Sequence, residues 1–222
     1  MFTMKWLRVS AALSLPLIGL TAHAQTFISN DLTQNLATNG SGTNLTDTQT
    51  KAYGFTTSAT AGFTFTSVTI ALSRISGTAN TVSGGIYANN AGNPSSTQLV
   101  AFDQVSVTTG AVNYRTLTPL SSLQLSPGTT YWVRLFSTTP GAGTQWDAVP
   151  STQPTVSGEA PSYITTVGYR NSNNNGGAWA TSGLTNGLTI TLATVPEPAT
   201  LALLALGIVG CIPNRVGKRK FP

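Results

Sequence analysis

"TTYWVRLF", Thr129 to Phe136, is the stretch that decides the fold. Successive side chains of an extended chain point to opposite faces, and here both faces carry large groups. One face would hold Tyr131, Val133 and Leu135, and the other Trp132, Arg134 and Phe136. The tripeptide before it, Ser126-Pro127-Gly128, places proline and glycine where a type II turn needs them. The stretch therefore predicts a β-strand that is entered through a tight turn.

Two other stretches show the same period of two. In "GLTITLAT", residues 187–194, apolar Leu188, Ile190 and Leu192 alternate with Thr189 and Thr191. "FTFTSVTIAL", residues 63–72, changes phase, because Phe63 and Phe65 have one parity while Val68, Ile70 and Leu72 have the other. A β-bulge near Ser67 would bring both sets onto one face, so the sequence predicts a bulged strand here.

The rest of the chain between residues 25 and 194 has no convincing helical period and many turn residues. Further strands are predicted at Ala52–Thr57, Ser83–Ala88, Gln98–Val107, Ala111–Leu117 and Thr165–Tyr169. Loops are predicted at Ser41–Thr50, Asn89–Pro94, Thr138–Gly143 and Asn171–Gly177. Many short strands separated by turns indicate an all-β fold, an antiparallel β-sandwich of jelly-roll-like type.

The charge of the chain is concentrated at its ends. The formal net charge is +5, yet residues 25–194 contain five basic and five acidic side chains. The bases are Lys51, Arg74, Arg115, Arg134 and Arg170, and the acids are Asp31, Asp47, Asp103, Asp147 and Glu159. Five scattered cations cannot form the basic patch that nucleic acids require, so no nucleic-acid partner is expected.

The single histidine, His23, and the single cysteine, Cys211, both lie outside this central part. The body therefore lacks the residues for a Ser-His-Asp or Cys-His nucleophile and for a zinc site of thiolate and imidazole. It cannot form disulfides either, so its hydrophobic core has to hold it together. We expect no cofactor, no metal and no catalytic residues. A calcium site at Asp31, Asp47 or Asp103 is unsupported, since these acids are isolated.

The N-terminal segment, residues 1–24, has the three parts of a cleaved signal peptide. Lys5 and Arg8 precede an apolar run, and Ala22-His23-Ala24 forms a small-x-small ending before Gln25. The alternative is an N-terminal membrane anchor, but the run is short and contains Pro16. We expect signal peptidase to cleave after Ala24 and a mature chain that begins at Gln25.

The C-terminal segment, residues 195–222, combines an apolar run with a basic cluster. As a helix, the uncharged run Ala199–Ile212 would be about 21 Å long, marginal against a hydrocarbon core of about 30 Å. Its membrane-facing residues would be Ala199, Leu201, Leu203, Leu204, Leu206, Ile208 and Val209. The basic cluster after this helix would then lie on the cytoplasmic side of the membrane; it comprises Arg215, Lys218, Arg219 and Lys220. The alternative is that the run is a helix or strand in the core of the sandwich. Such a core element is rarely apolar on all sides, and four cations rarely follow it directly.

"VPEPATLALLALGIVG…RVGKRK" resembles the PEP-CTERM sorting signal of Gram-negative bacteria. The resemblance covers residues 195–222, with Pro196, Glu197 and Pro198 as the motif. It implies export and recognition by an exosortase, a membrane peptidase that processes such tails. Two departures are the break at Cys211-Ile212-Pro213-Asn214 and an end at Phe221-Pro222 rather than on the cations.

The body carries a second resemblance. "YGFTT", "FTFTSVTIAL", "GGIYANNAGNP", "LQLSPGTTYWVRL" and "GLTITLATVPEP" are similar to the choice-of-anchor R type of extracellular domain. That resemblance implies a β-sandwich at the cell surface or in the extracellular matrix, and it implies no activity.

Two alternatives to a non-catalytic envelope or matrix protein follow from single residues. Trp146, Tyr169 and Trp179, in or near loops rich in Asn and Gly, could form an exposed surface that binds exopolysaccharide. Less favoured is a glycoside hydrolase, for which Asp147 and Glu159 would have to face each other across a cleft.

Overall fold

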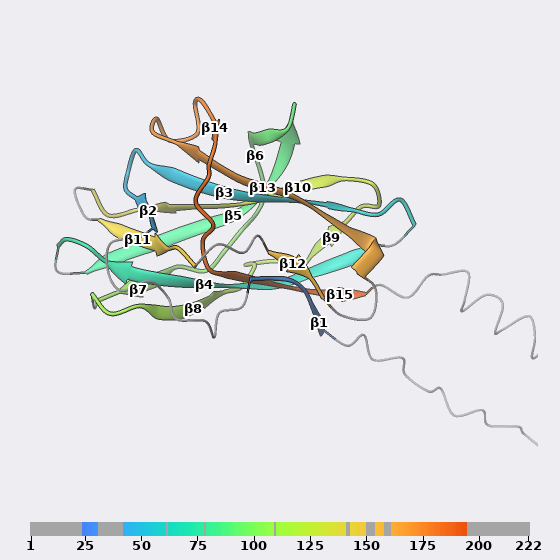
Figure 1. Ribbon diagram of the computed structural model, residues 1–222, viewed down its shortest axis with the longest axis horizontal. Coiled ribbons are helices and arrows are strands. Elements are labelled where there is room, and N and C mark those ends of the chain that lie inside the picture. The colour runs from blue at the N-terminus through green and yellow to red at the C-terminus, as the bar shows by residue number, and fades with distance from the viewer. Residues whose placement is uncertain are drawn as a thin grey trace, which may run out of the picture.

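The structure is a computed structural model, which describes residues 24–30, 42–60, 62–77, 79–108, 110–140, 143–149, 154–157 and 161–194. These residues form antiparallel β-strands and one 3₁₀ turn, η1 (Pro161–Tyr163). The strands make two sheets that lie one above the other (Figure 1). The all-β antiparallel fold predicted from the sequence is confirmed.

The first sheet has the order β12 (Thr155–Val156), β1 (Ala24–Ser29), β15 (Leu188–Thr194), β4 (Phe63–Arg74), β11 (Thr144–Asp147), β2 (Gly42–Leu45), with β8 (Asn113–Leu117) and β9 (Leu123–Leu125) also on β4. The second has the order β14 (Ala180–Thr181), β13 (Ile164–Ser172), β3 (Thr50–Thr57), β10 (Thr130–Ser137), β5 (Asn80–Asn90), β6 (Asn93–Ala101), with β7 (Val105–Val107) on β5. Most neighbours are distant in sequence, so the chain crosses repeatedly between the sheets.

Strand β10 is central in the second sheet, because it pairs with β3 on one side and β5 on the other. Its alternation is as predicted: Tyr131, Val133 and Leu135 enter the core between the sheets, while Trp132 belongs to a separate cluster. The turn before it has Gly128 at φ 65°, the left-handed conformation that glycine adopts without a Cβ penalty. Both predictions for this stretch are confirmed.

The core takes buried side chains from both sheets, among them Phe55, Ile86 and Val133 from the second and Phe65 and Ile190 from the first. The predicted bulge in β4 is present. Ser67 pairs with Thr191 but Phe65 pairs with Leu192, which leaves one extra residue between them. The two parities of β4 therefore reach the same core: Phe63, Phe65, Val68, Ile70 and Leu72 are all buried in it.

The outer face of the second sheet is also covered near its centre. Trp132 is fully buried there with Ala52 and Tyr87, and its Nε1 donates to Asn89 Oδ1 at 2.9 Å. The Arg170 guanidinium lies 5.5 Å from the centre of the Trp132 ring. Because this face is buried, the middle of the sheet has little tolerance for added volume.

Four of the segments predicted from the sequence have wrong boundaries, each for an identifiable reason. The predicted loop Asn89–Pro94 is a hairpin whose two turn residues, Ala91 and Gly92, have φ of 47° and 79°, the left-handed pair that suits strand twist. Gln98–Val107 is two strands rather than one. The break lies at Asp103, whose carboxylate accepts from the backbone and hydroxyl of Thr118.

The predicted polar loop Ser41–Thr50 contains β2, and the predicted loop Asn171–Gly177 begins inside β13. Among the described strands, β2 pairs with β11 alone, so it lies at the edge of this sheet and needs no apolar alternation. Ala111–Leu117 and Thr165–Tyr169 correspond to β8 and β13 with shifted ends.

The two ends of the described body lie side by side. Ala24 at the start of β1 pairs with Ala193 near the end of β15 (Figure 1). The segments before residue 24 and after residue 194 are thus attached at neighbouring points of one sheet.

Gly54 allows a specific test of the packing. A Cβ at this position would lie 2.7–2.8 Å from the Trp132 ring, which is fully buried and cannot yield easily. We expect Gly54→Ala to lower the free energy of unfolding by about 1–3 kcal/mol in chemical denaturation. Gly183→Ala is the control, since nothing lies within 4 Å of its Cβ position. Equal midpoints for the two variants would contradict this packing.

Candidate functional site

The aromatic residues expected to bind sugar do not share an exposed face. Trp146 is fully buried in β11, and Tyr169 in β13 is 2 % exposed. The Trp146 Nε1 donates to the Gly187 carbonyl at 2.8 Å, and the Tyr169 hydroxyl donates to the Asn186 carbonyl at 2.5 Å. The expected exposure of these two residues is wrong. Their polar neighbours in sequence occupy the alternate positions of the strands, so the rings themselves point into the core.

Trp179 has a different environment from the other two aromatic residues. It is half-buried just before β14, and its ring centre lies 5.6 Å from the Arg134 guanidinium. Its Nε1 is buried without a hydrogen-bond partner among the described residues. Only Trp179 of the three therefore has any surface to offer a ligand.

Asp147, the acid proposed for a hydrolase, is fully buried and accepts a hydrogen bond from Ser73 Oγ at 2.8 Å. Its Oδ2 has no hydrogen-bond partner among the described residues. Burial raises the pKa of this carboxyl from 3.8 to about 6, although the Ser73 hydrogen bond acts in the opposite direction. Glu159 lies outside the described residues. With no exposed surface, Asp147 is not positioned to contact a polymeric substrate.

The site that sequence reasoning missed is built around Lys51, which is fully buried on β3. Its ammonium donates to Thr43 Oγ1 at 2.7 Å, Ser182 Oγ at 3.0 Å and the Leu184 carbonyl at 2.9 Å. It also lies 4.9 Å from the centre of the Tyr169 ring. All three acceptors are uncharged, and burial lowers the pKa of Lys51 from 10.5 to about 7.

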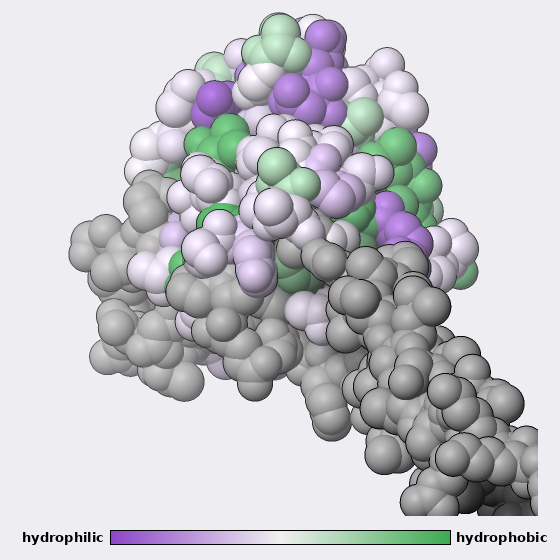
Figure 2. All heavy atoms as spheres, turned by 90° about the vertical axis from the view of Figure 1, so that its right-hand side faces the viewer, coloured by the Kyte–Doolittle hydropathy of each residue, from purple (hydrophilic) through white to green (hydrophobic). Residues whose placement is uncertain are grey.

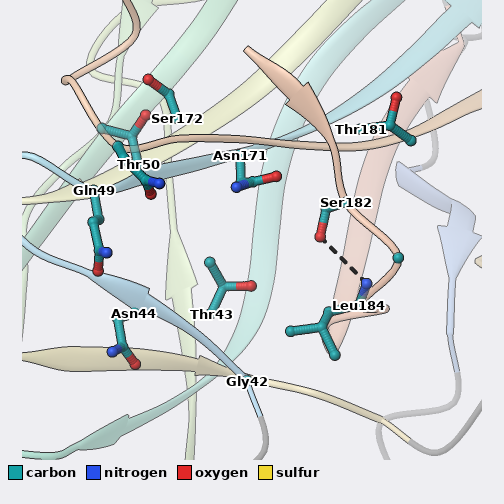
Figure 3. A pocket seen from close by; sticks show the side chains of 12 residues that line it. Gly42, Thr43, Asn44, Gln49, Thr50, Asn171, Ser172, Thr181, Ser182 and Leu184 are labelled. Carbon is teal, nitrogen blue, oxygen red and sulfur yellow. Dashed lines mark hydrogen bonds between the residues drawn. The ribbon is translucent and has the colours of Figure 1, made fainter. Parts of the chain in front are cut away.

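The acceptors of Lys51 line a polar cleft of about 320 Å³. Three segments surround it: β2 of the first sheet, the turn that leads into β3, and the chain from the end of β13 through β14 to Leu184. Figure 3 shows Thr43, Asn171 and Ser182 around the same space. The amide side chains in the wall are Asn44, Gln49, Asn171 and Asn173. The cleft thus lies at the end of the sandwich where the two sheets meet.

One wall of the cleft is held by its own hydrogen bonds. Asn174 Oδ1 accepts from the Ala178 amide and the Ser172 hydroxyl, both at 2.8 Å. The Asn175 amide donates to the Thr48 carbonyl at 2.7 Å, which ties the β13–β14 turn to the β2–β3 turn. Arg134 also holds the β13–β14 turn in place, because its guanidinium donates to the Asn175 carbonyl and to Asn175 Oδ1 at 2.8 Å each. The cleft is therefore preformed rather than made by a loose loop.

The second functional feature begins where β15 ends, at Thr194. Residues 194–220 match the PEP-CTERM protein-sorting motif. The chain therefore carries a sorting signal of the kind that exosortases recognise, which implies export and a cell-envelope route. No curated protein and no solved structure gives a significant match to the chain.

The residues of the PEP-CTERM motif, Pro196, Glu197 and Pro198, lie outside the described residues, as do the predicted membrane segment and basic cluster. Across the described ranges, no helix has the length and apolar character to cross a bilayer. Of the predicted signal cleavage site, Ala22 lies outside the description, while Ala24 and Gln25 are the first residues of β1. The cleavage site and the resemblance to choice-of-anchor R domains stay predictions.

Asp147 generates a prediction on stability. Its carboxyl is protonated in both folded and unfolded states below about pH 4, and as the pH rises through 6 the folded protein must hold a buried charge. Asp147→Asn removes this charge and keeps an oxygen that can accept from Ser73. We expect the variant to unfold like the parent near pH 4 and to be more stable by about 1–3 kcal/mol at pH 8. A stability difference that is the same at both pH values would contradict the burial of an ionisable group.

Proposed function

We propose that this protein is exported, sorted through its PEP-CTERM tail by an exosortase, and retained in the cell envelope or the exopolysaccharide matrix as a non-catalytic component. The observation that carries the proposal is the match at residues 194–220, directly after the last strand. In this proposal a signal peptidase removes the segment that ends at Ala24. The tail then anchors the chain in the membrane, with its basic cluster on the cytoplasmic side, until exosortase cleaves it.

The position of the chain ends supports two processing steps. A cut after Ala24 removes only the first residue of β1, and a cut near Pro196 to Pro198 removes no residue of β15. The pairing of Gln25 with Leu192 and of Ile28 with Ile190 would persist after both cuts. The sandwich can therefore be separated from both of its terminal segments without loss of a core strand.

The chemistry of the body supports a non-catalytic role. Residues 25–194 contain no histidine and no cysteine, and Asp147 is buried. Charged residues make up 8 % of the whole chain, against roughly 25 % in an average domain. On the face in Figure 2, many residues of near-neutral hydropathy separate the strongly hydrophilic and hydrophobic ones. A surface with so few charges exerts little long-range attraction on a highly charged macromolecule such as a nucleic acid, and it suits a hydrated polysaccharide environment.

A second candidate function, exopolysaccharide binding, is favoured by the polar cleft rather than by the aromatic residues. Its amide and hydroxyl groups are the polar groups that orient small ligands through hydrogen bonds.

The sorting proposal is tested by intact mass and cell fractionation in the native host, with and without its exosortase. We expect the exosortase-positive host to yield a chain that begins at Gln25 and ends near Pro196–Pro198, released or attached to matrix. Glu197→Ala should leave the tail uncut and the protein in the membrane, whereas the nearby Asn214→Ala should be processed as the parent is. Full-length protein in the membrane regardless of exosortase would refute the proposal.

A further inference from the structure

The charge behind the polar cleft has no counter-ion among the described residues. Lys51 donates its three hydrogen bonds to neutral oxygens of Thr43, Ser182 and Leu184, all of which line the cleft. Among the described residues, Tyr169 packs against Lys51 from within the core, and the Tyr53 ring lies tilted against the Tyr169 ring with 4.8 Å between the ring centres. Burial raises the pKa of both tyrosines, so they are neutral. A buried cation without a charged partner leaves a positive potential at the nearest accessible surface.

The wall of the cleft has no group that would repel an anion. In the part of the chain that the structure describes, the lining residues are all uncharged. Asp47 belongs to the neighbouring β2–β3 turn, where it is exposed and does not line the cleft. A negatively charged ligand would therefore meet only the field of Lys51 and neutral dipoles.

The same wall offers unused hydrogen-bonding groups. The side chains of Asn44, Gln49 and Asn171 make no hydrogen bond among the described residues, and each amide can both donate and accept. Thr50 is 1 % exposed, lines the cleft, and its hydroxyl has no partner within the described ranges. Buried polar atoms are normally paired, so the unpaired Thr50 hydroxyl points to a missing partner, and the three exposed or partly exposed amides beside it are free to bond a ligand.

The described residues that line the cleft include no aromatic ring, so they would not bind a sugar by stacking. Recognition would depend on hydrogen bonds and charge, and a volume of about 320 Å³ falls at the lower end of small-ligand sites, about 300–1,000 Å³. We propose that this cleft binds a carboxylate-bearing sugar unit of an acidic polysaccharide, with Asn44, Gln49 and Asn171 bonded to its hydroxyls and the Lys51 ammonium balancing its charge through the wall. This inference rests on the proposed delivery to the matrix, and it names the class of polysaccharide.

The test uses the mature protein purified from its native host and three probes. Two are uronate oligomers, oligogalacturonate and oligomannuronate, and the third is fully methyl-esterified oligogalacturonate, which has the same rings without the charge. We expect isothermal titration calorimetry at about pH 6, below the pKa of Lys51 of about 7, to show binding of at least one uronate oligomer, at least tenfold tighter than binding of the ester. No binding of either uronate, or equal affinity for acid and ester, would overturn the proposal.

Variants locate the site. Asn171→Ala and Gln49→Ala, which remove partly exposed amides, should each weaken binding about tenfold. Gln124→Ala is the control, because Gln124 is exposed at the opposite end of the sandwich, where β9 pairs with the start of β4. Lys51→Met should abolish the preference for acid over ester if it folds, which circular dichroism checks. If Lys51→Met does not fold, the Asn171→Ala and Gln49→Ala variants still test whether the ligand binds in this cleft. Unchanged affinity in both amide variants would place the ligand elsewhere. Because the protein used is already sorted, a failure to bind leaves the sorting proposal standing.

Discussion

One buried ammonium connects the two sheets at the end that carries the cleft. Lys51 extends from β3 of the second sheet to Thr43 on β2 of the first, and to Ser182 and Leu184 in the segment that returns toward β15. An ammonium removed from water is stable only if its donors are satisfied, and here all three are. The contact between β2, β3 and the chain after β14, and with it the shape of the cleft, depends on this arrangement.

The remainder of the body is held by packing alone. It has neither cysteine nor histidine, so its stability derives from two sheets whose facing side chains fill one core, with Trp146 and Tyr169 bonded to backbone carbonyls at its polar end. The second sheet is buried on its outer face as well, around Trp132. A structure of this kind can lose a segment at each end without losing a core strand, as export and tail removal would require.

Features that depend on local sequence could be predicted, and those that depend on distant contacts could not. Short windows of sequence determine several features: the alternation in β10 and β15, the bulge in β4, the turn at Gly128 and the sorting motif. Strand β2 has no such pattern, because an edge strand can be polar on both faces. Lys51 looked like one of five scattered cations. Its role becomes visible only when β2 and the segment after β13, which are far apart in the sequence, meet around it.

The affinity of the cleft for an anion depends on Lys51 being a buried cation that has no counter-ion in the described part of the chain. The most direct measurement is a pH titration of the full chain with ¹³C-labelled lysine, followed at the Lys51 Cε–Hε resonances by nuclear magnetic resonance. Because burial lowers the pKa of Lys51 to about 7, we predict a titration midpoint near neutrality for this residue. A midpoint near 10.5 would show that the ammonium is solvated, and would contradict both the closed end of the sandwich and the charge assigned to the cleft.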